Sequence, residues 1–137
     1  MNTQADQALD APASNTHNSM LWTGRVITAL IVLFMVFDGV TKVMQITPVV
    51  HAMQQGGFAP RLAPGIGILG LSCTLLYAIP RTSVLGAILL TAYLGGATVT
   101  NLRVDQPVYF SVVFGILVWG GLYFRDAVIR SLIPWRR

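Results

Sequence analysis

The sequence predicts an all-α integral membrane protein, a four-helix bundle with its N- and C-termini in the cytoplasm. Hydrophobic residues make up 54% of the 137 residues and charged residues only 10%, whereas soluble domains carry about 25% charged residues. The mean hydropathy is +0.65. The apolar residues are gathered into long segments separated by short connections. The length suits a single domain.

Four apolar segments supply the predicted helices, at residues 22–46, 62–79, 84–102 and 108–124. Each has roughly the 17 to 25 residues that span a hydrocarbon core when the helix rises about 1.5 Å per residue. The segments do not alternate between apolar and polar residues, as the strands of a membrane barrel do. They therefore predict four transmembrane helices, within one domain that covers residues 21–137.

The remaining segments are polar or rich in Pro and Gly. Residues 1–20 contain few large apolar side chains, so we expect a disordered tail that cannot offset its ordering entropy by burial. The connection at 79–83 is a tight turn that fits an antiparallel helix pair. The longest connection, 47–64, predicts a short interfacial helix near 49–55, because Pro48 suits the first turn of a helix.

Basic residues are distributed unevenly between the two ends of the predicted bundle. The end that holds the termini has six and the opposite end has three: Arg25, Arg81, Arg125, Arg130, Arg136 and Arg137 against Lys42, Arg61 and Arg103. Positive residues favour the cytoplasmic side, which predicts a multi-pass membrane protein with cytoplasmic termini. The arginines are scattered singly and form no basic stripe of the kind that binds nucleic acid, so the expected surroundings are the lipid bilayer.

Two charges interrupt the first segment, in FMVFDGVTKVMQ at residues 34–45. Asp38 and Lys42 are four residues apart and share one helix face, with the acid on the N-terminal side, the better orientation for an ion pair. One charge at the bilayer centre costs about 2.5 to 3.5 kcal/mol on insertion scales, and such residues are candidates for function. We interpret the pair as one wall of a polar pocket. The alternative is a structural ion pair that only orients the first helix.

The third segment offers partners at similar depth. TAYLGGATVTNLRV, residues 91–104, places a tyrosine near the membrane centre and Thr, Asn and Arg residues in the outer half. Thr and Asn can instead serve only as hydrogen-bonding groups between helices. The predicted ligand-binding residues are Asp38, Lys42, Tyr93, Asn101 and Arg103.

Small residues at four-residue spacing also mark the third segment. They form two ridges, Ala87, Thr91 and Gly95 on one and Ala92, Gly96 and Thr100 on the next. Small residues let helix backbones approach each other in lipid. We therefore expect the third helix to be the central packing element of the bundle.

Other reactive residue types give weaker signals. Cys73 is the single cysteine and lies in an apolar run, where we expect a small hydrophobe. Tyr77 and Arg81 are interpreted as an interfacial anchor and a positive-inside charge. His17 and His51 have no second ligand at metal spacing, so no metal site is predicted. No constellation for stand-alone catalysis is present, and enzymatic activity is left open, at most as an oxidoreductase subunit.

Three stretches resemble the DoxX-like family of small four-helix bacterial membrane proteins. They are LFMVFDGVTKV, LLYAIPRTSVLGAILLTAYLGGATVTNLRV and GILVWGGLYFRD. The likeness covers about residues 22–132, and YAIPRTSVLGAILLTAYLGGA is its most specific part. The resemblance implies a four-helix bundle in the bacterial cytoplasmic (inner) membrane. The family's name comes from a membrane subunit of a thiosulfate:quinone oxidoreductase, and some relatives are linked to thiol or oxidative-stress complexes.

These observations together lead to three functional hypotheses. The first is a redox-associated accessory protein that binds a quinone or a similar hydrophobic small molecule in an outer-half polar pocket. The second is a non-enzymatic structural or assembly subunit of a membrane oxidoreductase complex. The third is a small proton-coupled carrier, which would need to form a homo-oligomer. Relatives often carry histidine where this chain has Asn101, and this departure weakens a proton-transfer or redox role at that position.

Overall fold

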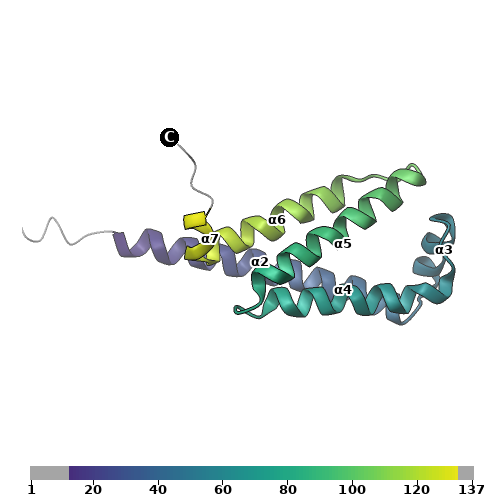
Figure 1. The fold of residues 1–137 in the computed structure, drawn as a ribbon, viewed down its shortest axis with the longest axis horizontal. Coiled ribbons are helices and arrows are strands. Elements are labelled where there is room, and N and C mark those ends of the chain that lie inside the picture. The colour runs from purple at the N-terminus through teal and green to yellow at the C-terminus, as the bar shows by residue number, and fades with distance from the viewer. Residues whose placement is uncertain (1–12, 133–137) are drawn as a thin grey trace, which may run out of the picture.

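The protein is all-helical over the part of the chain that its computed structural model describes, residues 13–132 (Figure 1). The elements are α2 (Ala13–Val43), α3 (Thr47–Gln55), the 3-10 helix η1 (Pro60–Leu62), α4 (Ala63–Ala78), α5 (Ser83–Arg103), α6 (Tyr109–Arg125) and α7 (Ala127–Leu132). The all-α prediction is confirmed for these residues. The four predicted long segments correspond to α2, α4, α5 and α6, and α3 is the predicted short helix. α7 was not predicted, so residues 13–132 form six α-helices rather than a bundle of four alone.

The first helix differs most from its predicted bounds. α2 begins at Ala13, so residues 13–20, which we expected in a disordered tail, belong to a helix. Extending a formed helix adds one hydrogen bond per ordered residue and avoids the cost of nucleation, which allows the apolar segment to continue into polar sequence. Residues 1–12 lie outside the described part. The helix ends at Val43 rather than at residue 46, and the chain turns at Gln45, where φ is 50°.

The short helix expected in the longest connection is present. α3 has Pro48 in its first turn, where the missing N–H has no helical partner to lose. Its Met53 is buried, and the helix ends at Gly56, followed by Gly57 with a φ of 76°. Gly adopts this left-handed conformation without steric penalty. The predicted location of α3 at a membrane interface stays a prediction.

Within residues 13–132, three helical stretches are long and apolar enough to cross a membrane: His17–Val43, Pro60–Ala78 and Ser83–Arg103. α6 is also apolar but shorter, with 17 residues. Large hydrophobic side chains face outward, as Leu33 does with 70% and Phe37 with 67% exposure. Extended apolar surface of this kind marks contact with a membrane or a partner. Length, composition and exposure together suggest lipid contact.

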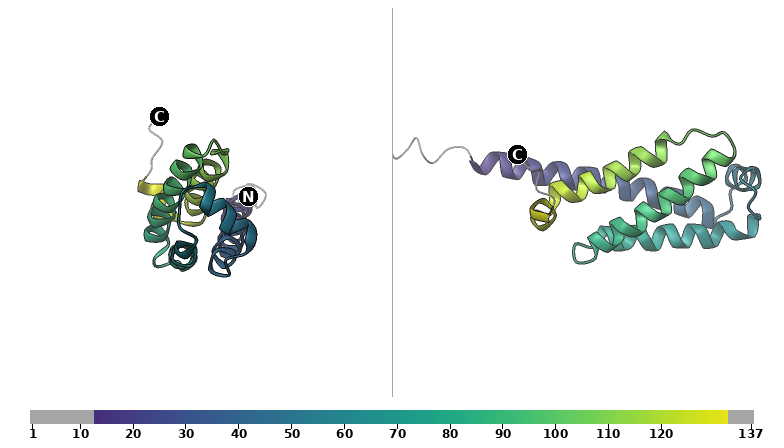
Figure 2. Two further views of the ribbon diagram at one scale, coloured as in Figure 1. Left: turned by 90° about the vertical axis from the view of Figure 1, so that its right-hand side faces the viewer. Right: turned by 45° about the horizontal axis from the view of Figure 1, so that its top comes forward.

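The four long helices form a ring in which each packs against two others. α2 and α5 both pack against α4 and α6, and they lie diagonally opposite each other. The predicted central role of the third helix, α5, is therefore not supported, because α2 has the same two neighbours. The pair α5 and α6 diverges from the pair α2 and α4 toward the end where α3 lies (Figures 1 and 2).

The helices are joined most tightly at the end opposite α3. A Cβ on Gly86 of α5 would lie 2.2 Å from the backbone nitrogen of Tyr77 in α4, so the two backbones touch there. Tyr77 is completely buried, and its hydroxyl donates a hydrogen bond of 2.9 Å to the Val118 carbonyl of α6. Arg125 donates to the Tyr77 carbonyl at 2.8 Å. The prediction of an interfacial anchor at Tyr77 is wrong, because its side chain is buried in the core and its hydroxyl is bonded to α6.

Candidate functional site

A close crossing of α2 and α4 positions the two charges of the first helix. A Cβ on Gly67 would lie 2.7 Å from the Gly39 carbonyl oxygen and 3.0 Å from Cβ of Lys42. Glycine at both positions lets the two backbones meet, as small residues do in membrane bundles. Because α2 lies so close to α4 here, the side chains of Asp38 and Lys42, on either side of Gly39 in the sequence, reach the cavity inside the bundle.

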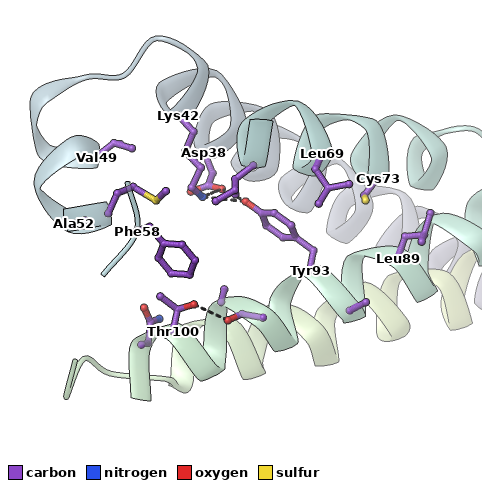
Figure 3. Close-up of a pocket in the computed structure, with 16 residues that line it drawn as sticks. Asp38, Lys42, Val49, Ala52, Phe58, Leu69, Cys73, Leu89, Tyr93 and Thr100 are labelled. Carbon is purple, nitrogen blue, oxygen red and sulfur yellow. Dashed lines mark hydrogen bonds and ion pairs between the residues drawn. The ribbon is translucent and has the colours of Figure 1, made fainter. Parts of the chain in front are cut away.

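The predicted ion pair is present and includes a third residue. Lys42 Nζ pairs with Asp38 Oδ2 and also donates to the Tyr93 hydroxyl at 3.0 Å. The Tyr93 hydroxyl donates in turn to Asp38 Oδ2 at 3.3 Å, and Figure 3 shows the ring of Tyr93 pointing from α5 to the two charges. The side chains of Lys42 and Asp38 are 20% and 30% exposed. We call these three residues the polar triad.

The tyrosine of the polar triad reaches across the bundle because α4 leaves room for it. A Cβ on Gly70 would lie 3.1 Å from Cζ and 3.2 Å from the hydroxyl oxygen of Tyr93. These separations are shorter than a comfortable van der Waals contact, so a larger residue at this position would push the ring away. Gly70 of α4 therefore leaves the space through which Tyr93 of α5 reaches α2, the helix diagonally opposite, and forms its hydrogen bonds there.

The polar triad lies at the wall of a cavity of about 730 Å³ between α4 and α5 (Figure 3). Most of the lining is apolar, and it includes Leu69 and Cys73 from α4 and Leu89 and Ala92 from α5. Ligand pockets in proteins commonly have about 300 to 1,000 Å³ and an apolar lining with a few convergent polar groups. The cavity therefore has the size and polarity of a site for a small amphiphilic molecule.

One end of the cavity is covered by α3 and the residues that follow it. Met53 and Phe58 line the cavity there, and Figure 3 shows the Phe58 ring above Thr100 of α5. A Cβ on Gly56 would lie 3.2 Å from the Thr100 methyl group. The connection between α2 and α4 thus reaches across to α5 and covers the space that the diverging helices leave.

Four of the five predicted ligand-binding residues line the cavity: Asp38, Lys42, Tyr93 and Asn101. Asn101 makes no side-chain hydrogen bond to another described residue. The fifth, Arg103, is exposed in the last turn of α5 and is not part of the lining. The structure therefore does not bring Arg103 to the polar triad.

Sequence reasoning missed the contributions of the connection and of Cys73. Cys73 is buried and free, as expected of a small hydrophobe, but it also lines the cavity. Phe58 carried no signal in its local sequence. Pro48 did predict the short helix, and only its direction over the cavity was missing.

The arrangement can bind and orient a ligand, and nothing in it constitutes a known catalytic set. No three His, Cys, Asp or Glu side chains of residues 13–132 gather where they could hold a metal ion. The two charges of the polar triad are opposite and in contact, so the part of the cavity wall that they form carries no formal net charge. Such a site favours a neutral head group with hydrogen-bonding oxygens over a strongly charged one.

Comparison with known proteins agrees with the resemblance seen in the sequence. The sequence model of the DoxX-like family matches residues 26–121, well over half of the chain. The matched range contains the polar triad and all the cavity-lining residues named above. No curated protein and no solved structure matches the chain.

Proposed function

This chain belongs to the DoxX-like family, and from that premise we propose that it is a redox-associated accessory protein of the bacterial inner membrane. In this proposal it binds a quinone or a similar hydrophobic small molecule in the cavity between α4 and α5. The single observation that carries the proposal is the apolar cavity with the polar triad at its wall. The association with redox complexes comes from the family alone.

The distribution of basic residues supports an orientation with cytoplasmic termini. Arg125 donates to the Tyr77 carbonyl at the inner end of α4, and the backbone of Gly24 meets that of Arg125. Arg25 and Arg81 belong to the same end of the bundle, whereas Arg103 lies at the opposite end. Positive charge favours the cytoplasmic side. The cavity and the polar triad then lie in the outer half of the membrane.

The chemistry of the polar triad suits a quinone oxygen. Lysine has three N–H donors, and Lys42 directs two of them at Asp38 and Tyr93. The third donor and the side-chain amide of Asn101 are available for a carbonyl oxygen in the cavity. A quinone is neutral and offers such oxygens on a flat apolar ring. The apolar lining would hold the ring and the first part of its tail.

Two neighbouring glycines of α5 provide a matched test of this site. A Cβ on Gly96 or on Gly95 would have no other atom within 4 Å, so both positions tolerate a larger side chain. Gly96 lines the cavity and Gly95 does not. Gly96→Leu would fill part of the cavity, whereas Gly95→Leu would add a similar apolar side chain to the outer surface.

Binding of a radiolabelled short-chain quinone to protein in lipid nanodiscs measures the effect, with empty nanodiscs as the background. We expect wild type and Gly95→Leu to bind alike and Gly96→Leu to bind at least about tenfold more weakly, a difference of about 1.4 kcal/mol. Lys42→Met should weaken binding by about fivefold, the loss of roughly one hydrogen bond. Absence of quinone binding to wild type, or equal binding by the two leucine variants, contradicts the proposal.

The mutual contacts of the polar triad also favour a second candidate, a structural or assembly subunit of a membrane oxidoreductase complex. Asp38, Lys42 and Tyr93 satisfy one another and join α2 to α5 without any ligand. Under this alternative, co-purification with a larger oxidoreductase would be lost when the triad is removed, while Gly96→Leu would have no effect on it.

A further inference from the structure

The cavity has exposed lining residues on both α4 and α5, which place an opening between these two helices. On that side Leu69 is 57% exposed and Leu89 is 36% exposed, and both line the cavity. Ala92 and Gly96, which also line it, are exposed as well. The side of the bundle away from this opening is closed by α2 and α6, which pack against each other. α2 also packs against α4, and α6 also packs against α5. The opening therefore faces outward from the bundle at the middle of two apolar helices.

The residues around this opening suit an apolar molecule. Leu69, Leu89 and Ala92 offer no hydrogen-bonding side-chain group, and no atom lies within 4 Å of a Cβ on Gly96. A hydrated polar solute would lose its water contacts there without compensation. A molecule already dissolved in lipid would lose none.

The end that faces water is closed by a connection that is fixed at several points. The Phe58 N–H donates to the Met53 carbonyl at 2.9 Å, and the Gln45 side-chain amide donates to the Pro60 carbonyl at 3.1 Å. Met53 is only 8% exposed. Gly56 packs against Thr100, so α3 bridges the gap between the two helix pairs. A solute from the aqueous side would have to displace this cover.

From these observations we propose that the ligand is a membrane-dissolved amphiphile that enters the cavity sideways from the bilayer, between α4 and α5. The inference rests on the proposed function, because it takes α4 and α5 to span the membrane and the cavity to be the ligand site. It adds the route and the class of ligand. A water-borne solute, which a small carrier would transport, is the alternative that the test below separates from it.

Cys73 provides the readout, because it is the single cysteine of the chain and lines the cavity. The full-length protein is reconstituted into liposomes and treated with N-hexadecylmaleimide, which dissolves in the bilayer, or with a sulfonated maleimide present on both sides. Each labelling rate is divided by the rate on the same protein unfolded in dodecyl sulfate. Cys73→Ala gives the background.

We expect the lipid-dissolved reagent to label Cys73 at least about tenfold faster than the sulfonated one after this correction, a ratio equivalent to a barrier difference of about 1.4 kcal/mol. Gly96→Trp, which places an indole in the opening, should slow the lipid-dissolved reagent by a similar factor. Gly95→Trp adds the same ring outside the cavity and should leave the rate unchanged.

The proposal is overturned if the sulfonated reagent reacts as fast as the lipid-dissolved one, or if neither reagent labels the folded protein. Equal rates for the two tryptophan variants would overturn it as well. If Gly96→Trp fails to fold, the ratio of the two labelling rates on the wild-type protein still tests the entry route. Quinone binding is measured separately, so its absence beside fast lipid-side labelling would refute the proposed ligand and leave the route standing. Quinone binding without faster labelling by the lipid-dissolved reagent would refute only the route.

Discussion

Removing one charge of the polar triad should destabilise the protein more than removing both. The variants are Asp38→Asn, Lys42→Gln and the double variant that carries both changes. In wild type the two charges compensate each other, and Lys42 also donates to the Tyr93 hydroxyl. Each single change leaves the other charge partly buried and without its counter-ion, whereas the double variant leaves two neutral amides that can bond to each other.

The expected size of the effect follows from how deeply the pair is buried. Breaking a fully buried ion pair by deleting one partner costs about 3 to 5 kcal/mol. The side chains of Lys42 and Asp38 are 20% and 30% exposed, so water or lipid head groups can solvate part of the orphaned charge. We expect each single variant to lose about 1 to 3 kcal/mol of unfolding free energy. The double variant should lose less than either single variant, which requires a coupling energy larger than the larger single loss, about 1 to 3 kcal/mol.

The assay is a double-mutant cycle of unfolding free energies, measured by titrating dodecyl sulfate into protein held in mild detergent micelles. Losses that simply add in the double variant would refute the reasoning, because they would mean that the two charges do not interact. Quinone binding by the same proteins separates the two functional hypotheses. A double variant that is stable but binds no quinone supports the ligand site, and one that keeps full binding contradicts a role for the charges in it.

Two further changes test the packing at the end of the bundle away from α3, and the same unfolding measurements report both. Gly86→Ala should cost about 1 to 3 kcal/mol, because its Cβ would lie 2.2 Å from the backbone nitrogen of Tyr77, which cannot turn aside. Gly95→Ala, in open space on the same helix, should be neutral or stabilising, and an equal loss there would contradict the close contact. Tyr77→Phe should lose about 1 kcal/mol with its hydrogen bond to the Val118 carbonyl. Tyr123→Phe is the matched control, and equal losses would count against that bond.

The axial positions of the site residues could be predicted from the sequence. The rise of a helix is constant, so the segment bounds predict the positions of Asp38, Lys42 and Tyr93 along their helices. The four-residue spacing predicts the ion pair, which is present. The hydrogen bonds that join Tyr93 to both charges were not predicted, because they depend on how α2 and α5 are rotated.

The rotation of each helix could not be predicted. Helices whose surfaces are apolar all round carry no polar face to indicate which side meets the core. Arg103 was therefore assigned to the pocket by depth, although it is exposed and does not line the cavity. In the same way Gly95 and Gly96 looked like packing positions and are open, while the closest α4–α5 contact is made at Gly86.

Long-range contacts also decided the roles of two aromatic residues. Tyr77 near a helix end has the local sequence of an interfacial anchor, and only the arrival of α6 makes it a buried hydrogen-bond donor. Phe58 lies in a polar, Gly-rich connection and becomes part of the cavity wall because α3 turns back over the bundle. Both contacts join residues that are far apart in the sequence, so the residues next to Tyr77 and Phe58 do not indicate them.

The most direct test of the central claim is to map where a quinone binds. A short-chain quinone that carries a small diazirine is photolysed with the protein in nanodiscs, and the modified residues are found by peptide mass spectrometry. The account predicts labels on cavity residues such as Met53, Leu69 and Ala92, which an excess of unmodified quinone prevents and Gly96→Leu abolishes. Labels confined to lipid-facing residues such as Leu33 or Phe110, or labels that excess quinone does not reduce, would contradict it.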